Sequence, residues 1–90
     1  MRFIYDEEKN KANQERHHVS FEEVIEIWRD PNLLVLHARR RGEKRLMAIG
    51  QAYCMLYTVI HTKRGDAIRI ISARRSTERE RRAYVRNKNN

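Results

Sequence analysis

The stretch VSFEEVIEIWRDP, residues 19–31, contains the best-specified helix of the chain. Ser20 and Glu23 have the spacing of a capping box, in which each side chain accepts a hydrogen bond from a backbone N–H left unpaired at the helix start. Val19 and Val24 occupy the positions of the hydrophobic staple that accompanies such a start. The other apolar residues of the stretch form a broad face, so we expect this helix to lie in the core until the Asp-Pro pair ends it.

A second, more polar helix is predicted before this stretch. Residues 2–5 have the apolar and aromatic character of a short strand, and Asp6 is a good N-cap with two glutamates in the turn that follows. The helix then continues to about His17, with Ala12 as its only small hydrophobe. Because it has almost no apolar face, we expect docking to hold it, which leaves polar side chains for other roles.

The residues after Pro31 predict a sheet. Four β-rich runs follow one another at residues 33–37, 45–50, 54–62 and 67–73. Glycine-containing segments at 40–43 and 63–66 suit hairpin loops. Because the distances between the runs are too short for crossover helices, we expect an antiparallel meander.

A last helix completes the predicted order. Thr77 and Glu80 have the spacing of a second capping box, and the helix that they open continues to about Arg86, before a tail that we expect to be frayed. We therefore predict an α+β fold in a single domain, residues 1–90. It has a short N-terminal strand, two helices packed on one face of an antiparallel sheet, and a C-terminal helix.

Charge is distributed unevenly along the chain. The 20 Lys and Arg residues exceed the 12 Asp and Glu residues, which gives a formal net charge of +8. Residues 1–33 hold five basic and eight acidic residues, whereas residues 34–90 hold 15 basic and four acidic residues. A basic portion of this kind is typical of proteins that bind nucleic acid or another phosphate-bearing partner, although a merely solubilising surface has the same composition.

Several classes of protein do not fit the sequence. A single cysteine rules out an internal disulfide, and no apolar segment has the length of a signal peptide or a membrane span. We therefore expect a cytoplasmic protein with no membrane association. Metal-ligand motifs, phosphate-binding glycine loops and nucleophile elbows are missing as well, so neither a metal nor a cofactor is expected. Cys54 falls inside an apolar run, where we expect it to be a small buried hydrophobe.

The remaining candidates for chemistry are cations and an imidazole. Lys9, Asn13, Arg16 and His17 recur at helical spacing, which predicts one polar stripe on the first helix. Cleavage of RNA without a metal uses the neighbouring 2′-hydroxyl as the nucleophile, so the protein supplies a base, an acid and cations for the phosphate. Histidine transfers protons near neutral pH, and lysine can do so among basic neighbours. The structural alternative for His17 is a contact with the last carbonyls of its helix.

Arg69 is the most informative single residue, because it lies in an otherwise apolar run. A buried arginine needs an anion or another acceptor. Arg69 is therefore either paired with a carboxylate from the helices or open to the phosphate of a ligand. Strict alternation along the strand predicts that Arg69 and Arg75 share one face and that Arg74 lies on the other.

Further residues are candidates for RNA binding rather than for catalysis. The aromatic rings of Tyr5 and Tyr84 could stack on a base. The arginine run at residues 39–41 is expected to be a solvated hairpin tip that helps to attract RNA.

Two groups of residues resemble the BrnT family, which comprises toxins of type II toxin–antitoxin systems. In the first half of the chain, the resemblance is carried by residues 3–9, by Asn13 and His17, and by residues 19–23. In the second half it is carried by residues 69–74 and 80–84, while residues 48–50 and 62–65 also fit. The similarity spans residues 1–86. Tyr5 stands where the family often has Trp, and His18 stands where a Gly often follows the histidine, at a position that suits a left-handed conformation.

The resemblance implies a fold similar to that of RelE toxins and an endoribonuclease that cleaves RNA without a metal and blocks translation. It also implies a hetero-oligomer with a cognate, BrnA-like antitoxin, through which alone the complex binds DNA and represses its own operon. We predict four catalytic residues, Lys9, His17, Arg69 and Arg74. We predict three RNA-binding residues, Arg75, Arg81 and Tyr84.

Two other interpretations of the sequence stay open. The first is a non-enzymatic, basic RNA- or DNA-binding regulatory module, which would bind in a salt-dependent manner without producing cleavage products. The second is an interaction subunit whose cationic face only holds an acidic protein partner.

Overall fold

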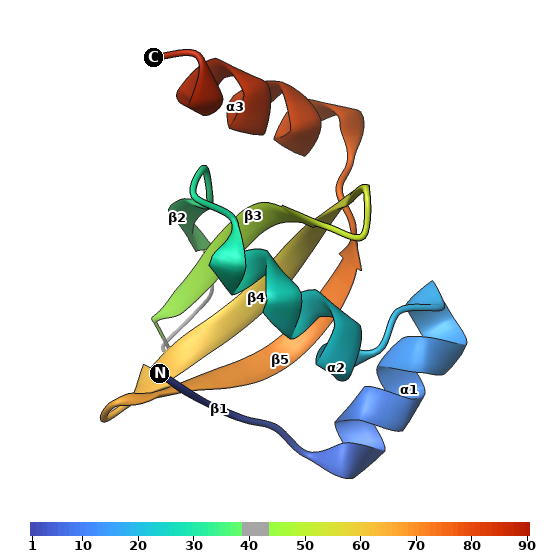
Figure 1. Ribbon diagram of the computed structural model, residues 1–90. Coiled ribbons are helices and arrows are strands. Elements are labelled where there is room, and N and C mark those ends of the chain that lie inside the picture. Colours follow the sequence, from blue (N-terminus) through green and yellow to red (C-terminus); the bar gives the residue numbers. More distant parts are fainter. Residues whose placement is uncertain (39–43) are drawn as a thin grey trace.

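A computed structural model describes residues 1–38 and 44–90 and shows a five-stranded sheet with helices around it (Figure 1). The strands are β1 (Arg2–Ile4), β2 (Leu34–Ala38), β3 (Arg45–Ala52), β4 (Met55–Arg64) and β5 (Ala67–Arg75). The helices are α1 (Glu7–His17), α2 (Phe21–Val24) with the 3-10 helix η1 (Ile25–Arg29) directly after it, and α3 (Glu78–Lys88). This arrangement confirms the predicted α+β fold. The expected hairpin loop at 40–43 and the arginine run at 39–41 lie outside the described residues.

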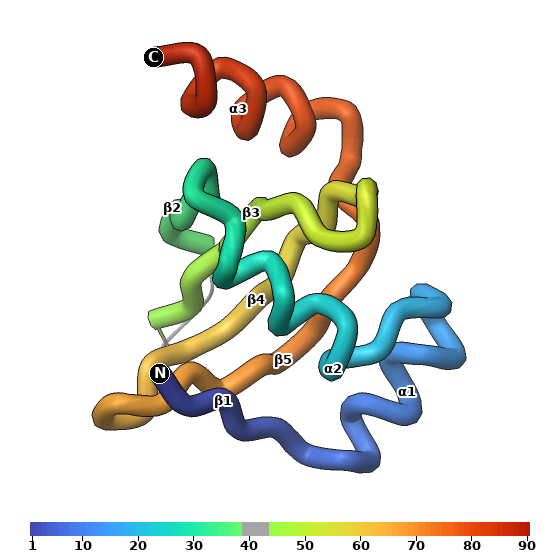
Figure 2. Tube along the Cα trace, viewed as in Figure 1, coloured from blue at the N-terminus to red at the C-terminus, as the bar shows by residue number. Residues whose placement is uncertain are grey.

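The strand order of the sheet is β1-β5-β4-β3-β2. Strands β2 to β5 form the antiparallel meander that was predicted, whereas β1 pairs in parallel with β5, with Phe3 opposite Ile68. The trace in Figure 2 shows β1 and then α1 following each other along the outer side of β5. One edge of the sheet is therefore occupied by the N-terminal part of the chain, and β2 forms the other edge.

Helix α1 docks through two buried asparagines instead of an apolar face. The side chain of Asn13 donates to the carbonyl oxygens of Ala73 and Val19, both at 2.8 Å, and accepts from the N–H of Ala73 at 3.0 Å. The side-chain oxygen of Asn10 accepts from the N–H of Phe21 at 2.9 Å. Asn13 thus satisfies backbone groups of β5 beyond the end of β1, which fixes α1 against the edge of the sheet.

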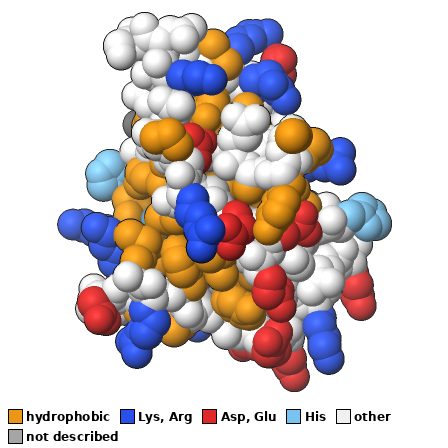
Figure 3. Space-filling model, viewed as in Figure 1, with side chains coloured by type: hydrophobic (Ala, Val, Ile, Leu, Met, Phe, Trp, Pro, Cys, Tyr) orange, Lys and Arg blue, Asp and Glu red, His pale blue; other side chains and the backbone are white. Residues whose placement is uncertain are grey.

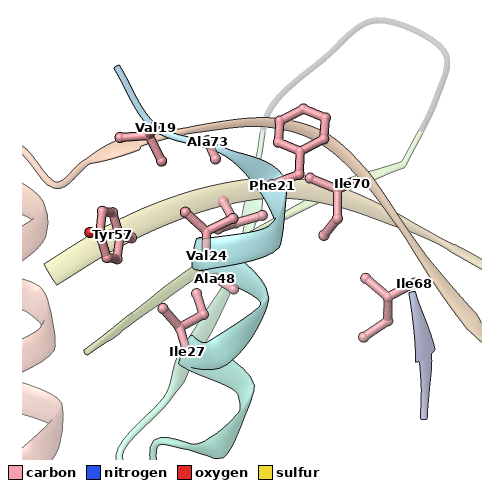
Figure 4. Close-up of a cluster of buried hydrophobic side chains, with 10 residues drawn as sticks. Val19, Phe21, Val24, Ile27, Ala48, Tyr57, Ile68, Ile70 and Ala73 are labelled. Carbon is pink, nitrogen blue, oxygen red and sulfur yellow. The ribbon is translucent and has the colours of Figure 1, made fainter. Parts of the chain in front are cut away.

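Helix α2 and η1 cover one side of the sheet, which we call the core face (Figure 4). Phe21, Val24 and Ile27 are fully buried there against β3, β4 and β5. The other side, which carries Thr58, Ile60 and Thr62 of β4, is the open face, and α3 lies against only one end of it. The two faces of one sheet therefore have different surroundings, and only the core face is closed over by helices.

The predicted central helix begins as expected but changes its geometry. The capping box of Ser20 and Glu23 is present. After Val24 the α-helix tightens into η1, so the prediction of one α-helix as far as Asp30 is wrong in its second half. Side chains three residues apart are eclipsed in a 3-10 helix, which directs both Val24 and Ile27 at the sheet. A Cβ on Gly50 would lie 2.8 Å from the Cβ of Ile27, so this close approach requires glycine in β3.

Helix α3 starts at the second predicted capping box and lies at the end of the sheet (Figure 1). It extends to Lys88, two residues beyond the predicted end at Arg86. The hydroxyl of Tyr84 donates to Asp30 at 2.7 Å, and the same carboxylate oxygen accepts from the N–H of Gln51 at 2.8 Å. Asp30 therefore joins α3, η1 and β3.

A β-bulge changes which side chains of β5 share a face. Ile71 has no partner in β4, because the register shifts at this point. Arg69 pairs with Thr62 and Arg74 pairs with Thr58, and these two threonines lie on the open face. The prediction that Arg69 and Arg74 lie on opposite faces is therefore wrong. The extra residue inverts the side-chain alternation and places both arginines on the open face.

The connection between β3 and β4 is tighter than predicted. Tyr53 and Cys54 have φ angles of 51° and 63°, as in a two-residue type I′ hairpin turn. The prediction of a buried Cys54 within a strand is therefore wrong, and the thiol is exposed. Such turns usually contain Asn or Gly, and this one contains neither, so the sequence lacks the signal that identifies them.

Candidate functional site

A pocket of about 320 Å³ lies between α1 and the open face of the sheet. The lining residues from α1 are Lys9, Ala12, Asn13, Arg16 and His17, and those from the sheet are Arg45, Ile71 and Ser72. The lining contains three basic side chains and an imidazole but no carboxylate among the described residues. We call it the α1 pocket. Its charge suits an anionic ligand.

The asparagine docking of α1 explains the geometry of this pocket. Lys9 and His17 lie four residues before and after Asn13, so successive helical turns place all three on one side of α1. Asn13 is anchored to β5 and is only 6% exposed. The predicted polar stripe is confirmed, because its four residues all line this pocket. Within the stripe, Asn13 has a structural role, since it holds α1 against β5.

The three ionisable side chains of α1 in this pocket are not engaged by the rest of the protein. Within residues 1–38 and 44–90, no hydrogen bond or ion pair involves the side chain of Lys9, Arg16 or His17. The helix end is closed instead by the backbone N–H of His18, which donates to the carbonyl of Gln14 at 2.9 Å with His18 in the left-handed region. The three side chains are therefore available to a ligand.

Arg69 lies on the open face, half-buried and opposite Thr62. In the part of the chain that the structure describes, its guanidinium has neither a carboxylate partner nor a side-chain hydrogen bond. The hydroxyl of Thr62 is also buried without a hydrogen-bond partner in that part. Of the two alternatives for Arg69, the described residues provide no structural ion pair, and the buried hydroxyl of Thr62 on the neighbouring strand has no hydrogen-bond partner among them.

Arg74 differs from Arg69 because it forms an ion pair with Glu80. The guanidinium donates to both carboxylate oxygens of Glu80, at 2.6 and 2.8 Å, and Glu80 also accepts from the hydroxyl of Thr58 at 2.9 Å. Burial raises the pKa of Glu80, but the hydrogen bonds from Arg74, from the Thr77 backbone and from Thr58 outweigh it and lower the pKa to about 2. Arg74 is therefore fixed in position at the α3 end of the open face.

The three predicted RNA-binding residues are not brought to the α1 pocket. Arg75 pairs with Tyr57 and so belongs to the core face, whereas Arg81 lines a separate pocket beside α3. Tyr84 is 3% exposed. Burial and the hydrogen bond to Asp30 raise the pKa of Tyr84 to about 12. Its ring therefore has no free face for a base, and the ring of Tyr5 packs edge-on against Phe21.

Two polar residues of the α1 pocket were not predicted from the sequence. Arg45 begins β3 and Ser72 follows the bulge in β5, and both line the pocket. Their proximity to α1 depends on the strand order and on the bulge. Neither feature has a local sequence signal.

Residues 1–38 and 44–90 contain neither a metal-binding cluster nor a membrane-spanning helix. No group of three or more His, Cys, Asp or Glu side chains there is arranged to hold a metal ion. No helix there has the length and apolar character that crossing a bilayer requires.

Comparison with known protein families gives a match over most of the chain. The model of a family described as a ribonuclease toxin, BrnT, of a type II toxin–antitoxin system matches residues 5–80. The chain matches none of the curated proteins. The matched range includes the whole of the α1 pocket, Arg69 and Arg74.

Proposed function

The chain belongs to the BrnT family of ribonuclease toxins of type II toxin–antitoxin systems, and we propose that it is an endoribonuclease whose reaction needs no metal. We place the reaction in the α1 pocket and along the adjoining open face of β5. The single observation that carries this proposal is the composition of the pocket, in which an unengaged lysine, arginine and histidine from one helix face the sheet.

The chemistry of RNA cleavage matches the side chains that the pocket provides. A base removes the proton of a 2′-hydroxyl, the oxygen attacks the adjacent phosphorus, and the bond to the 5′ oxygen breaks as an acid protonates it. The products carry a 2′,3′-cyclic phosphate and a 5′-hydroxyl. We assign the two proton transfers to His17 and Lys9, which lie two helical turns apart in one pocket.

The arginines are assigned to the phosphate. The transition state has more negative charge on its oxygens than the substrate, so cations placed beside it lower the barrier. Arg69 suits this role because no described carboxylate competes for its guanidinium. Arg74 is oriented by Glu80, and we propose that it contacts the RNA strand at the α3 end of the open face.

The biological role follows from the family. Toxins of this type have RNA as substrate and an antitoxin protein as partner. We propose that cleavage by this chain inhibits translation and growth in the cytoplasm, and that its fold is of the RelE type. We further propose that a BrnA-like antitoxin neutralises it in a hetero-oligomer, which binds DNA only through the antitoxin and represses its own operon.

The test is cleavage of end-labelled RNA by the purified chain in excess EDTA. We expect cleavage to continue, with 2′,3′-cyclic phosphate ends. Replacement of Lys9 or His17 by alanine should slow it by about 100-fold or more, which is the usual contribution of a general acid or base. Lys11→Ala is the matched control, because Lys11 is an exposed lysine of the same helix that does not line the pocket.

Two outcomes would contradict the proposal. Loss of cleavage in EDTA that Mg²⁺ restores would show that the reaction needs a metal. Salt-dependent binding of RNA with no cleavage products would identify a non-enzymatic binding module.

A further inference from the structure

We propose that the outer edge of β2 is the docking site of the antitoxin, which adds an extended segment to the sheet as a sixth strand. The proposal rests on the family's implication that an antitoxin exists, and it concerns a different part of the molecule from the α1 pocket. Strands β3 and β4 separate β2 from β5.

The first observation is that β2 lacks the features that normally protect an edge strand. Within the described residues it pairs only with β3, and it continues for five residues without a bulge. Its sequence, LVLHA, has no lysine, no other charged residue and no proline. Val35 is 46% exposed and Leu36 is 38% exposed. Soluble proteins rarely leave an apolar edge of this kind open, because it can pair with another chain.

The second observation is that an apolar groove adjoins β2 on each face of the sheet. On the core face, a groove of about 740 Å³ has Trp28, Leu33, Val35 and Leu46 in its lining. On the open face, a groove of about 340 Å³ lies between β2, β3 and α3 and includes Leu36, Met47 and Ile49. Side chains of a strand alternate between faces, so one added strand can fill both grooves with alternate residues.

The charge of the groove on the core face indicates the chemistry of the occupant, whereas the groove on the open face has both Arg79 and Glu80 in its lining. The groove on the core face has Lys44 and Lys63 in its lining and no carboxylate among the described residues. Figure 3, viewed from the core-face side, shows hydrophobic side chains gathered across the middle of the molecule, with basic side chains at the left margin and an acidic group below them. An extended segment of alternating apolar residues with acidic neighbours would complement this surface.

The same charges argue against a second copy of the toxin as the occupant. Edge-to-edge pairing of two β2 strands would bring the lysines of two grooves together, in two chains that each have a net charge of +8. Like charges placed close together oppose association. The antitoxin segment is therefore the occupant that we infer.

The test uses the complex of the full-length toxin with the antitoxin of its own operon. We expect hydrogen exchange at backbone amides of β2 to slow when the antitoxin is bound. Val35→Lys should weaken the complex by about tenfold or more, since it removes an apolar anchor and adds a charge to the groove. Lys63→Glu, an exposed change that keeps the strand intact, should also weaken it. Val85→Lys is the matched control, because Val85 is 44% exposed on α3 and lines neither groove.

RNA cleavage by the free variants separates this proposal from the proposed function. Val35→Lys and Lys63→Glu should cleave RNA as the wild type does, because neither residue lies in the α1 pocket. The docking site would be overturned if hydrogen exchange in β2 stayed unchanged on antitoxin binding. It would also be overturned if both variants bound the antitoxin with normal affinity, even if the wild type cleaves RNA. A toxin dimer that dissociates on Val35→Lys would show that a second copy occupies this edge and would overturn it as well.

Discussion

The two faces of the sheet differ in what covers them and in the side chains that they carry. On the core face, apolar side chains of α2 and η1 close over β3, β4 and β5. On the open face, the same strands carry arginines and threonines, with α1 fixed at one side by asparagines. Charge alone therefore does not locate a site. The proposed site lies where cations remain unengaged after the core and its ion pairs have formed.

Phe21→Ala should have the largest effect on the core face. Phe21 is 0% exposed, and truncation of a buried phenylalanine costs about 3–5 kcal/mol. Because small domains have little stability in reserve, this variant should be largely unfolded. Urea denaturation followed by circular dichroism measures the change, and a loss below about 1 kcal/mol would contradict the assignment of the core.

Asn13→Ala tests whether the docking of α1 contributes both to stability and to the proposed site. It removes three hydrogen bonds and leaves backbone groups of Ala73 and Val19 without partners. Unsatisfied buried groups cost about 1–3 kcal/mol each, so we expect a loss of about 3 kcal/mol in the free energy of unfolding, together with loss of RNA cleavage. Lys11→Ala, on the exposed side of the same helix, is the control and should change stability by only about 0.5 kcal/mol.

Glu80→Gln tests the ion pair on the open face through its pH dependence. The pKa of Glu80 is lowered from 4.5 to about 2 in the folded state, so its contribution is present above the unfolded value and is lost as the pH falls from about 4.5 toward 2. Because Arg74 is 36% exposed, we discount the shift and expect a loss on the order of 2 kcal/mol at pH 7. Denaturation of both proteins across this pH range should show the difference shrinking as the pH falls. A difference that is independent of pH would contradict the ion pair.

His18→Gly should have the smallest effect, and in the stabilising direction. His18 has a φ angle of 58°, where glycine avoids a steric penalty of about 1 kcal/mol. Thermal unfolding should show a slightly higher midpoint, with RNA cleavage unchanged. A lower midpoint would mean that the imidazole of His18 makes a stabilising contact.

The features of this molecule that depend on neighbouring residues could be predicted from the sequence. Both capping boxes and the polar stripe of α1 follow from short spacings along the chain. The left-handed conformation at His18 matches the position where glycine is frequent in the family. The predicted catalytic residues Lys9 and His17 line one pocket because helical periodicity determined their relative placement.

Features that depend on long-range pairing were missed for a physical reason. The bulge at Ile71 appears only when β5 is paired with β4, and it reversed the predicted faces of Arg69 and Arg74. The hydroxyl of the buried Tyr84 donates a hydrogen bond to Asp30, which is 54 residues away. Asn10 and Asn13 looked like surface residues of a polar helix, because nothing local shows that their amides meet the backbone of other elements.

We propose that unengaged cations on the open face, rather than total charge, carry RNA cleavage. Two variants that remove one arginine each test it directly. Arg69 lies on the open face, whereas Arg29 lies in η1, is 85% exposed and pairs with Glu26. We predict that Arg69→Ala lowers the rate of RNA cleavage by about 100-fold or more while the free energy of unfolding stays within about 1 kcal/mol of the wild type, and that Arg29→Ala changes neither. Equal losses of cleavage in the two variants, or full activity of folded Arg69→Ala, would contradict the account.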